Sequence, residues 1–359
     1  MALDFLYLLG DLGDGGQERD LYFFTRSLKK KGYTTAIAVW DLNKNDKYYP
    51  LFTEMGIELI DLTAYSKPQR MLQLRKIVKA RKPKVFNSFT FHLNFPVFFA
   101  CVFTGTKSLG GIKNRLELYR RDSSFLLFMV SCFLPRHQLS NNSRCAEGFP
   151  LAWLFKLWNK TYTLRNSMDV DHFTTEYYPK NDGVIRTVSV GRMFSEKRID
   201  LLIQLIYNLQ QQGYKIQHRH AGKGPLEAEL KQMVADKGME SYFEFAGTQT
   251  QINQFIKEAD FLIHTSDYEG CPNAVMEGMA SGRPVLSTDC GDVSFLIEDG
   301  VNGYVTPLND IQMLTQRAIA LIQDENMRHR MGEIGRQKAA TMFPHDVFAD
   351  KNLELYKQL

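Results

Sequence analysis

Apolar residues in the first 90 positions fall in short runs that alternate with longer amphipathic stretches. Residues 3–9 are almost wholly apolar, a glycine-rich turn follows at 10–16, and residues 18–31 have helical periodicity that ends in three lysines and Gly32. Basic residues in a last turn followed by glycine are typical of a helix end. Further strands are expected at 35–40, 57–61 and 85–88, and a helix at 68–81. This alternation predicts a parallel sheet covered by helices.

A second alternation of the same kind begins at residue 185. It predicts strands at 185–190, 215–221, 243–246, 261–265 and 284–287, and helices at 198–212, 225–237, 250–259 and 274–281. The aromatic-rich stretch 89–166 mixes strand and helix signals and gives no boundary. Residues 177–183 have linker composition, and a last helix at 347–359 follows a break at Pro344.

We therefore expect an α/β fold of two Rossmann-like domains with parallel sheets that face each other across an interdomain cleft. Residues 1–178 form the first expected domain, and residues 179–344 form the second. The C-terminal helix, within 345–359, is expected to cross back to the first domain, because it is short and separated from the second. A chain of 359 residues is also too long for one ordinary core.

Composition excludes several classes of protein. At 44% hydrophobic and 23% charged residues, the chain resembles a soluble globular protein. Its five cysteines lack the spacing of a zinc site or of a disulfide framework, which favours a reducing cytoplasm. The runs 95–104 and 125–134 are about half of the roughly 20 residues that span a bilayer. We expect a cytoplasmic protein without a membrane-spanning segment.

Charge is unevenly distributed. Residues 1–178 contain 25 Lys and Arg against 16 Asp and Glu, whereas residues 179–359 contain 19 against 24. A basic first half indicates either an anionic partner, such as a membrane surface or a phosphate-bearing acceptor, or merely a solvated surface. Four arginines bracket the apolar run 125–134: Arg115, Arg120, Arg121 and Arg136. That stretch is either a peripheral contact with the inner face of the cytoplasmic membrane or a buried helix with a cationic rim. We expect no nucleic-acid partner.

Ligands of open parallel sheets bind at the carboxyl ends of strands, where helix N-termini direct backbone N–H groups outward. Two segments of the second half occupy such positions. Arg192 and Lys197 follow the strand 185–190, and their guanidinium and ammonium groups suit a diphosphate. The alternative is that both residues are solvated loop cations.

The second segment, Glu269 to Glu277, follows the strand 261–265. Its turn and helix start consist of Gly270, Cys271, Pro272 and Asn273, so that a ligand could approach the backbone closely. Glu277, one turn into the helix, could bind the diol of a ribose. Glu269, on the loop, could contact a sugar ring.

The first half offers a glycine-rich loop with Gly15 and Gly16, whose spacing is not that of a dinucleotide fingerprint. It could admit a substrate phosphate or sugar. His92 follows the strand 85–88 in an aromatic-rich segment.

The second half resembles family 4 glycosyltransferases, which have the B-type glycosyltransferase fold. The resemblance rests on Val-Gly-Arg-Met-Phe-Ser-Glu-Lys at 190–197, Ala-Gly-Lys-Gly-Pro-Leu at 221–226, Phe-Ala-Gly at 245–247, Glu-Gly-Cys-Pro-Asn-Ala-Val-Met-Glu at 269–277, Met-Ala-Ser-Gly-Arg-Pro-Val at 279–285 and Ile-Glu-Asp-Gly-Val-Asn-Gly-Tyr at 297–304. Gly-Gly-Gln-Glu-Arg at 15–19 is similar to the family's N-terminal Gly-Gly loop. Lys223 stands where the family often has an acid, which leaves the donor open.

The resemblance implies a retaining transfer of a hexose or N-acetylhexosamine from a nucleotide-diphosphate sugar, UDP before GDP. It implies that Arg192 and Lys197 hold the diphosphate, Glu277 the ribose and Glu269 the transferred sugar. Gly16 would lie next to the diphosphate. His92 would contact the donor sugar or the acceptor, or it is a histidine packed among aromatic residues. The resemblance also implies that residues 179–344 bind the donor and residues 1–178 bind the acceptor. The implied acceptor is a glycan or a lipid-linked molecule of surface polysaccharide or glycoconjugate biosynthesis.

No cofactor or metal is expected, because Arg192 and Lys197 could stabilise the leaving group. Asp169-Val-Asp171 has the letters of a metal-binding motif found in another glycosyltransferase fold, but it lies in the segment before the linker. Two other functions stay open. One is a non-catalytic module that binds a sugar nucleotide, and the other is a different sugar-nucleotide or sugar-phosphate enzyme, such as an epimerase or phosphorylase.

Overall fold

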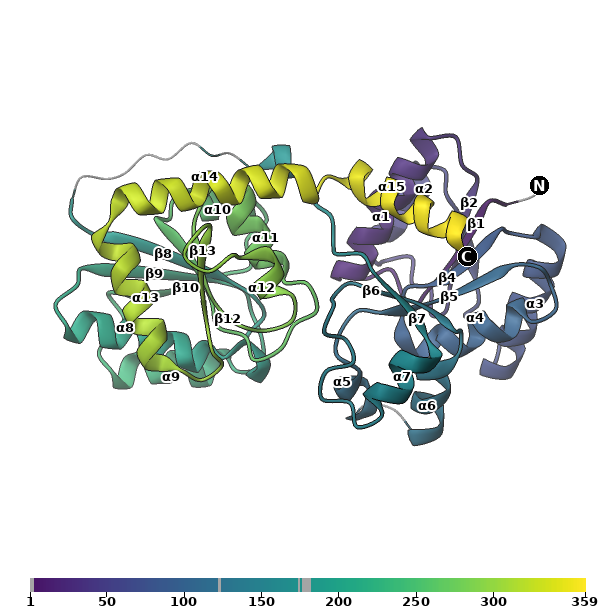
Figure 1. Cartoon of the computed structure of the whole chain (residues 1–359), viewed down its shortest axis with the longest axis horizontal. Coiled ribbons are helices and arrows are strands. Elements are labelled where there is room, and N and C mark those ends of the chain that lie inside the picture. The colour runs from purple at the N-terminus through teal and green to yellow at the C-terminus, as the bar shows by residue number, and fades with distance from the viewer. Residues whose placement is uncertain (1–2, 122–123, 174, 176–181) are drawn as a thin grey trace. The chain divides into compact units, whose positions relative to one another are not determined.

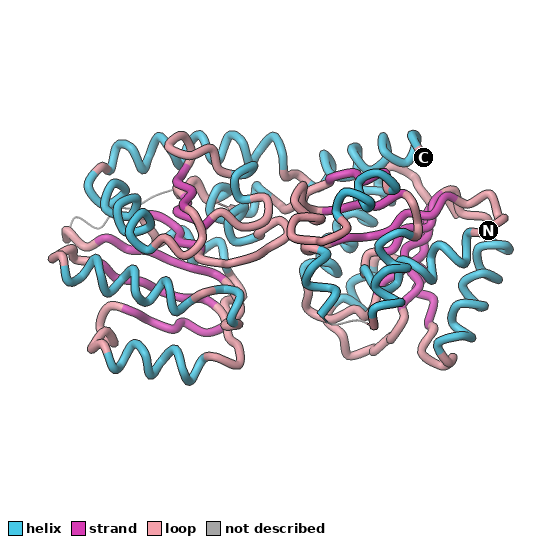
Figure 2. Tube along the Cα trace, turned by 60° about the horizontal axis from the view of Figure 1, so that its bottom comes forward, coloured by secondary structure: helices cyan, strands magenta, loops and turns pink. Residues whose placement is uncertain are grey.

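The computed structural model describes residues 3–121, 124–173, 175 and 182–359, with Arg121 described in its backbone alone. The chain divides into two compact units (Figure 1). Unit 1 comprises Met1–Met168 and His345–Leu359, and unit 2 comprises Asp169–Pro344. The predicted domain boundary after residue 178 falls outside the described residues. In each unit, helices flank a sheet of strands, as Figure 2 shows in cyan and magenta.

Unit 1 contains a seven-stranded parallel sheet with the order β3-β2-β1-β4-β5-β6-β7. Its strands are β1 (Phe5–Leu9), β2 (Thr35–Val39), β3 (Glu58–Asp61), β4 (Val85–Ser88), β5 (Lys107–Ile112), β6 (His137–Ser140) and β7 (Lys160–Thr163). Its helices are α1 (Gly16–Lys30), α2 (Tyr48–Glu54), α3 (Lys67–Arg81), η1 (Phe91–Leu93), α4 (Asn94–Cys101), α5 (Leu116–Arg121), α6 (Phe125–Phe133), α7 (Ala152–Trp158) and α15 (His345–Gln358).

Unit 2 contains a six-stranded parallel sheet with the order β10-β9-β8-β11-β12-β13. Its strands are β8 (Ile185–Val190), β9 (Ile216–Ala221), β10 (Phe243–Gly247), β11 (Phe261–His264), β12 (Val285–Thr288) and β13 (Gly303–Thr306). Its helices are η2 (Val170–His172), η3 (Ser195–Lys197), α8 (Ile199–Gln211), α9 (Glu227–Asp236), α10 (Ile252–Lys257), α11 (Asn273–Ala280), α12 (Val293–Leu296), α13 (Ile311–Gln323) and α14 (Glu325–Met342). The predicted α/β class with two parallel sheets is confirmed.

The order of strands in both sheets reverses beside the first strand of the unit. In unit 1, β1 lies between β2 and β4, and in unit 2, β8 lies between β9 and β11. Such a switch point leaves a crevice at the carboxyl ends of the two central strands, because their connections leave in opposite directions. The predicted site residues follow β1, β4, β8 and β11, so the topology places them at these two switch points.

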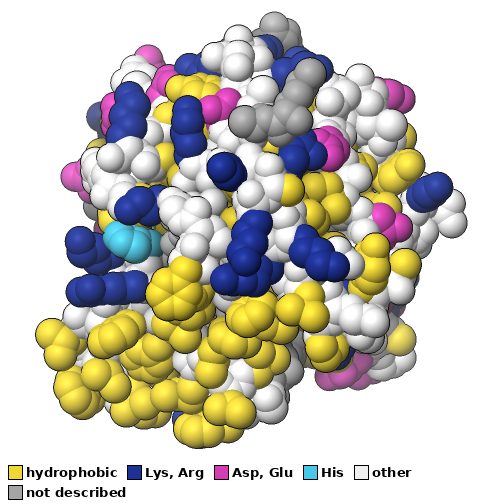
Figure 3. Space-filling model, turned by 90° about the vertical axis from the view of Figure 1, so that its right-hand side faces the viewer, with side chains coloured by type: hydrophobic (Ala, Val, Ile, Leu, Met, Phe, Trp, Pro, Cys, Tyr) yellow, Lys and Arg dark blue, Asp and Glu magenta, His cyan; other side chains and the backbone are white. Residues whose placement is uncertain are grey.

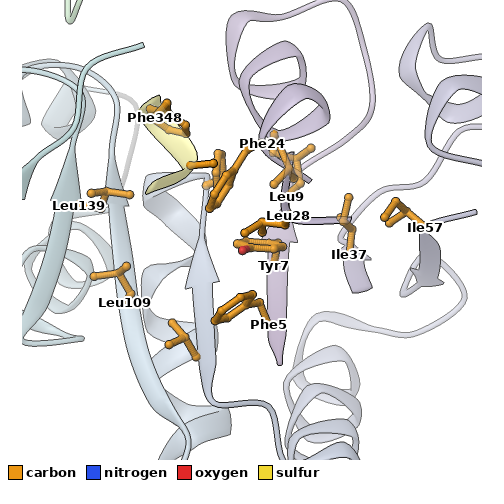
Figure 4. Packing of buried hydrophobic residues seen from close by; sticks show 14 of the residues in the cluster. Phe5, Tyr7, Leu9, Phe24, Leu28, Ile37, Ile57, Leu109, Leu139 and Phe348 are labelled. Carbon is orange, nitrogen blue, oxygen red and sulfur yellow. The ribbon is translucent and has the colours of Figure 1, made fainter. Parts of the chain in front are cut away.

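The C-terminal helix α15 packs in unit 1, as predicted. Phe348 lies in the core of that unit beside Phe24, with ring centroids 5.4 Å apart, and Figure 4 shows both near Tyr7 of β1. The ring of His345 stacks on Phe23 at 3.9 Å, and Lys31 forms an ion pair with Asp350. The helix therefore completes the core of unit 1, although residues 169–344 separate it from the rest of that unit in sequence.

Candidate functional site

The loops that follow β8 and β11 are tied to each other in unit 2. The two strands are direct neighbours, so their loops leave the sheet at the same edge. The amide of Asp267 donates to the carbonyl of Glu196 at 2.8 Å, and the hydroxyl of Thr265 donates to the carbonyls of Lys197 and Arg198, each at 3.0 Å. These bonds bring together two segments that lie about 70 residues apart in the sequence.

Lys197 and Glu269 meet at this edge. The ammonium of Lys197 forms an ion pair with Oε1 of Glu269, and the two side chains are only 19% and 18% exposed. The hydroxyl of Ser266 donates to the same oxygen at 3.1 Å, and Nε2 of His264 lies 3.4 Å from it. Nδ1 of His264 is in turn 3.0 Å from the hydroxyl of Ser287 on β12. A buried carboxylate with this set of partners has a fixed position.

The surroundings of Glu269 keep its carboxyl group charged. Burial alone would raise its pKa, but the hydrogen bond from His264 and the nearby cation Lys197 outweigh burial and lower the pKa to about 2. The carboxylate is therefore ionised at neutral pH, and the ammonium of Lys197 balances its charge.

Glu277 lies one turn into α11, the helix that begins just after Pro272. Its side chain is buried, with 6% of its surface exposed. The turn before the helix is fixed by a backbone hydrogen bond, in which the amide of Asp292 donates to the carbonyl of Gly270 at 3.1 Å. A Cβ on Gly291, which has a φ of 53°, would lie 2.3 Å from that carbonyl. The segment of Gly270, Cys271, Pro272 and Asn273 thus rests on a second glycine turn.

Arg192 lies on the loop between β8 and η3. Two backbone bonds fasten this loop to the turn after β9, from Gly191 to Ala221 at 2.9 Å and from Met193 to Lys223 at 3.0 Å. The close approach requires glycine at position 222, where a Cβ would lie 1.8 Å from the carbonyl of Gly191. The guanidinium of Arg192 is exposed and lies over the ring of Phe194, 4.8 Å from its centroid.

The predicted residues of unit 1 gather at the carboxyl edge of its own sheet. Gly15 is the N-cap of α1, and Gly16 is the first residue of that helix. His92 lies in η1 after β4, half-buried, with its ring edge-on to Tyr119 at 5.6 Å. The amide of Gly10 donates to the hydroxyl of Thr90 at 3.2 Å, which joins the loop before α1 to the loop after β4.

Two acids of α1, which sequence reasoning did not select, lie just after these glycines. Burial, helped by the charges of Asp11 and Asp20, raises the pKa of Glu18 to about 7 against the lowering effect of Glu18's own backbone amide. Burial also raises the pKa of Asp20 to about 6. Their position in the first turns of a helix was visible in the sequence, whereas their burial was not.

The histidine and serines around Glu269 were also missed as site residues. His264 and Ser266 belong to the segment that sequence analysis selected, but their contacts depend on how the chain turns after β11. A surface hollow of about 490 Å³ lies next to this cluster and is lined by Ser195, Glu196, Asp267 and Tyr268 among others.

Asp171, from the pair that resembles a metal motif, is fully exposed and forms an ion pair with Arg336 at 3.7 Å. Within the described part of the chain, no group of three His, Cys, Asp or Glu side chains is close enough to hold a metal ion.

Comparisons with known proteins show which proteins the chain resembles. Residues 174–338 match the family model described as glycosyl transferases group 1. The amylovoran biosynthesis glycosyltransferase AmsK of Erwinia amylovora is 28% identical over 252 residues, which cover 68% of this chain and 60% of AmsK. The putative colanic acid biosynthesis glycosyltransferase WcaL of Salmonella typhimurium is 30% identical over 43% of this chain and 40% of WcaL. The chain thus matches less than two thirds of the length of these relatives.

Among solved structures, Alr3699/HepE of Anabaena, determined in complex with UDP, superposes with a TM-score of 0.84 over the full length of both chains at 16% identity. This likeness confirms the B-type glycosyltransferase fold. Residues 174–338, which hold Arg192, Lys197, Glu269 and Glu277, belong to the group 1 glycosyltransferase family.

Proposed function

We propose that this chain is a retaining glycosyltransferase that uses a nucleotide-diphosphate sugar, a UDP-sugar first and a GDP-sugar second. The sugar is a hexose or an N-acetylhexosamine, and the acceptor is a glycan or a lipid-linked molecule of surface polysaccharide or glycoconjugate biosynthesis. The observation that carries the proposal is the buried Lys197–Glu269 pair at the switch point of unit 2. Alr3699/HepE, which shares the fold, was also determined with UDP-glucose.

In the proposed reaction, the bond between the anomeric carbon and the diphosphate oxygen breaks, and its electron pair leaves with the diphosphate. The acceptor hydroxyl oxygen bonds to the anomeric carbon on the same face, and its proton goes to the leaving diphosphate. Lys197 and Arg192 stabilise the negative charge that grows on the diphosphate. Because these two cations neutralise the charge that a divalent ion would otherwise neutralise, we propose that the reaction needs no metal.

The other residues position the donor. Glu269, held ionised and fixed by Lys197, His264 and Ser266, accepts hydrogen bonds from hydroxyls of the transferred sugar. The amides of the turn from Gly270 to Asn273 lie beside it. Glu277 binds the ribose diol, and Gly15, Gly16 and His92 act from unit 1 on the diphosphate, the sugar or the acceptor. Because its pKa is raised to about 7, Glu18 is partly protonated at neutral pH. This protonation reduces the negative charge beside Gly15 and Gly16, which are proposed to contact the diphosphate.

The proposal is tested by incubating the protein with UDP-glucose, UDP-N-acetylglucosamine and GDP-mannose without acceptor and measuring the release of nucleoside diphosphate. We expect slow hydrolysis of one donor, which is lost in the double variant Arg192→Ala/Lys197→Ala. Proton NMR of the first sugar released identifies its anomer, and an α-sugar from an α-linked donor supports retention. A protein that binds a donor without releasing diphosphate would be a binding module, and a β-anomer as first product would contradict retention.

A further inference from the structure

Helices α6 and α7 of unit 1 expose an unusual amount of apolar surface. Phe125, Leu126 and Leu127 on α6 are 71%, 75% and 40% exposed, and Trp153, Leu157 and Trp158 on α7 are 66%, 75% and 50% exposed. We call these six residues the α6–α7 patch. Two of the three tryptophans of the chain lie in it. Large apolar side chains that gather on an exposed surface indicate an interaction site.

The two helices are well anchored beneath this patch, so its exposure is not a sign of poor packing. Phe128 and Cys132 on α6 and Phe155 on α7 are fully buried in one core cluster. The indole N–H of Trp158 donates to the carbonyl of Phe133 at 3.1 Å, which joins α7 to the end of α6. Each helix therefore has one buried face and one exposed apolar face. The buried-helix alternative accounts for only one face of α6.

Positive charge lines one side of the patch. The guanidinium of Arg136 lies over the ring of Trp158 and donates to its carbonyl at 3.0 Å. Lys156 lies on α7 itself, and Lys160 follows that helix; both are exposed. Between residues 124 and 165 the sequence contains five Lys and Arg and a single acidic residue, Glu147. Figure 3 shows hydrophobic side chains gathered on the lower part of this face, with Lys and Arg side chains next to them.

The surroundings of His137, on β6, show that these cations lie close together. Burial lowers the pKa of His137, and the charges of Lys160, Arg136 and Lys107 lower it further. A second copy of the chain is a poor occupant for the patch, because two such cationic rims would face each other. A lipid bilayer with anionic headgroups fits better, because the headgroups attract the cations and the apolar interior buries the exposed rings.

We propose that the α6–α7 patch docks unit 1 onto an anionic lipid bilayer, with Trp153 and Leu157 inserted among the lipids and Arg136, Lys156 and Lys160 against the phosphate groups. Attachment would be peripheral, since no helix in the described residues is long and apolar enough to cross a membrane. The sequence pointed to residues 125–134 and four arginines. The structure adds α7 and its lysines, and it shows that Arg115 is directed to the carbonyl of Glu147 and the side chain of Glu117 instead.

The test is co-sedimentation of the full chain with vesicles of phosphatidylcholine, with and without 30% phosphatidylglycerol (about a third anionic lipid, as in an anionic leaflet), at low and at high salt. The wild-type protein should bind the anionic vesicles, and high salt should weaken binding. Trp153→Ala/Leu157→Ala should lower the partition coefficient about tenfold or more, because both large apolar side chains are lost. Lys156→Glu/Lys160→Glu should reduce binding at low salt and flatten its salt dependence.

One matched control is Ile334→Ala, which removes an exposed apolar residue of unit 2 (40% exposed). The other is Lys44→Glu/Lys67→Glu, which reverses the charge of two exposed lysines of unit 1 that do not belong to α6 or α7. Both should bind vesicles like the wild type. Failure to bind any vesicle, or equal binding by the patch variants, would overturn the proposal. A wild-type dimer in light scattering that the Trp153→Ala/Leu157→Ala variant loses would assign the patch to a second copy. Docking does not depend on the proposed activity, and donor hydrolysis without vesicles measures that activity separately.

Discussion

Removing the charge of Glu269 should destabilise unit 2 in a way that depends on pH. The pKa of this carboxyl group falls from 4.5 to about 2 in the folded protein. At about 1.36 kcal/mol for each pKa unit, the folded state gains up to about 3 kcal/mol from the ionised form at pH 7. A carboxyl whose pKa is lowered by folding stabilises the protein above its unfolded pKa. That stability is lost as the pH falls from about 4.5 towards 2.

Glu269→Gln keeps the shape of the side chain and removes its charge. Hydrogen–deuterium exchange of peptides from β8 and β11 measures the opening free energy of unit 2 separately from that of unit 1. At pH 7 the variant should open more easily by up to about 3 kcal/mol, and the difference should shrink below pH 4.5. The control Glu244→Gln affects an exposed pair with Arg219, in which the carboxylate is 58% exposed, and should cost about 1 kcal/mol or less. Equal stability of Glu269→Gln and wild type at pH 7, or a difference that grows at lower pH, would refute the reasoning.

Three further changes test other parts of the structure. Lys197→Ala should lower kcat of diphosphate release more than it raises KM, because its charge is needed most in the transition state; a change in KM alone would contradict that role. Gly222→Ala should lower the melting temperature far more than Gly238→Ala, because a Cβ at 222 would lie 1.8 Å from the carbonyl of Gly191, whereas nothing lies within 4 Å at 238; similar melting temperatures would show that the loop is not fastened there. Phe348→Ala should destabilise unit 1 by about 3–5 kcal/mol, measured as denaturant unfolding monitored by tryptophan fluorescence. Leu72→Ala, at a side chain that is 53% exposed, should cost little stability.

The strands β1 and β11, one at each switch point, were predictable because they are largely apolar. β1 is buried at every position, and a strand covered on both faces is an uninterrupted apolar run. The helix α15 was predictable from the break at Pro344 that separates it from α14. In both cases the signal lies within a few neighbouring residues.

The stretch 89–166 gave no reliable reading, for a physical reason that β5 illustrates. A Cβ on Gly111 would lie 2.3 Å from the carbonyl of Ser88 on β4, and one on Gly110 would lie 2.2 Å from the side chain of Gln138 on β6. Close packing between strands thus demands glycine where sequence patterns expect β-branched residues. Buried polar groups of the same region, such as Asn94 between β5 and Gln138, hide the apolar periodicity further.

The charged residues of the candidate site were selected from the sequence, but the pairing of Lys197 with Glu269 could not be predicted from it. Lys197 and Glu269 were selected from separate motifs, and the sequence analysis assigned Lys197 to the diphosphate and Glu269 to the sugar. Their contact arises because β8 and β11 are neighbours in the sheet, which depends on the topology of the whole unit. The partners His264, Ser266 and Ser287 depend on the same long-range order.

The central claim is that the Glu269–Glu277 segment forms a nucleotide-diphosphate-sugar site in unit 2. Isothermal titration of UDP, and then of GDP, into the wild type and Glu277→Ala tests this most directly, with Glu244→Ala as a control for an exposed glutamate. We predict saturable binding of UDP, weakened at least about tenfold in Glu277→Ala through the lost ribose contacts and unchanged in Glu244→Ala. Absence of saturable binding of both nucleotides, or equal affinity in Glu277→Ala, would contradict the account.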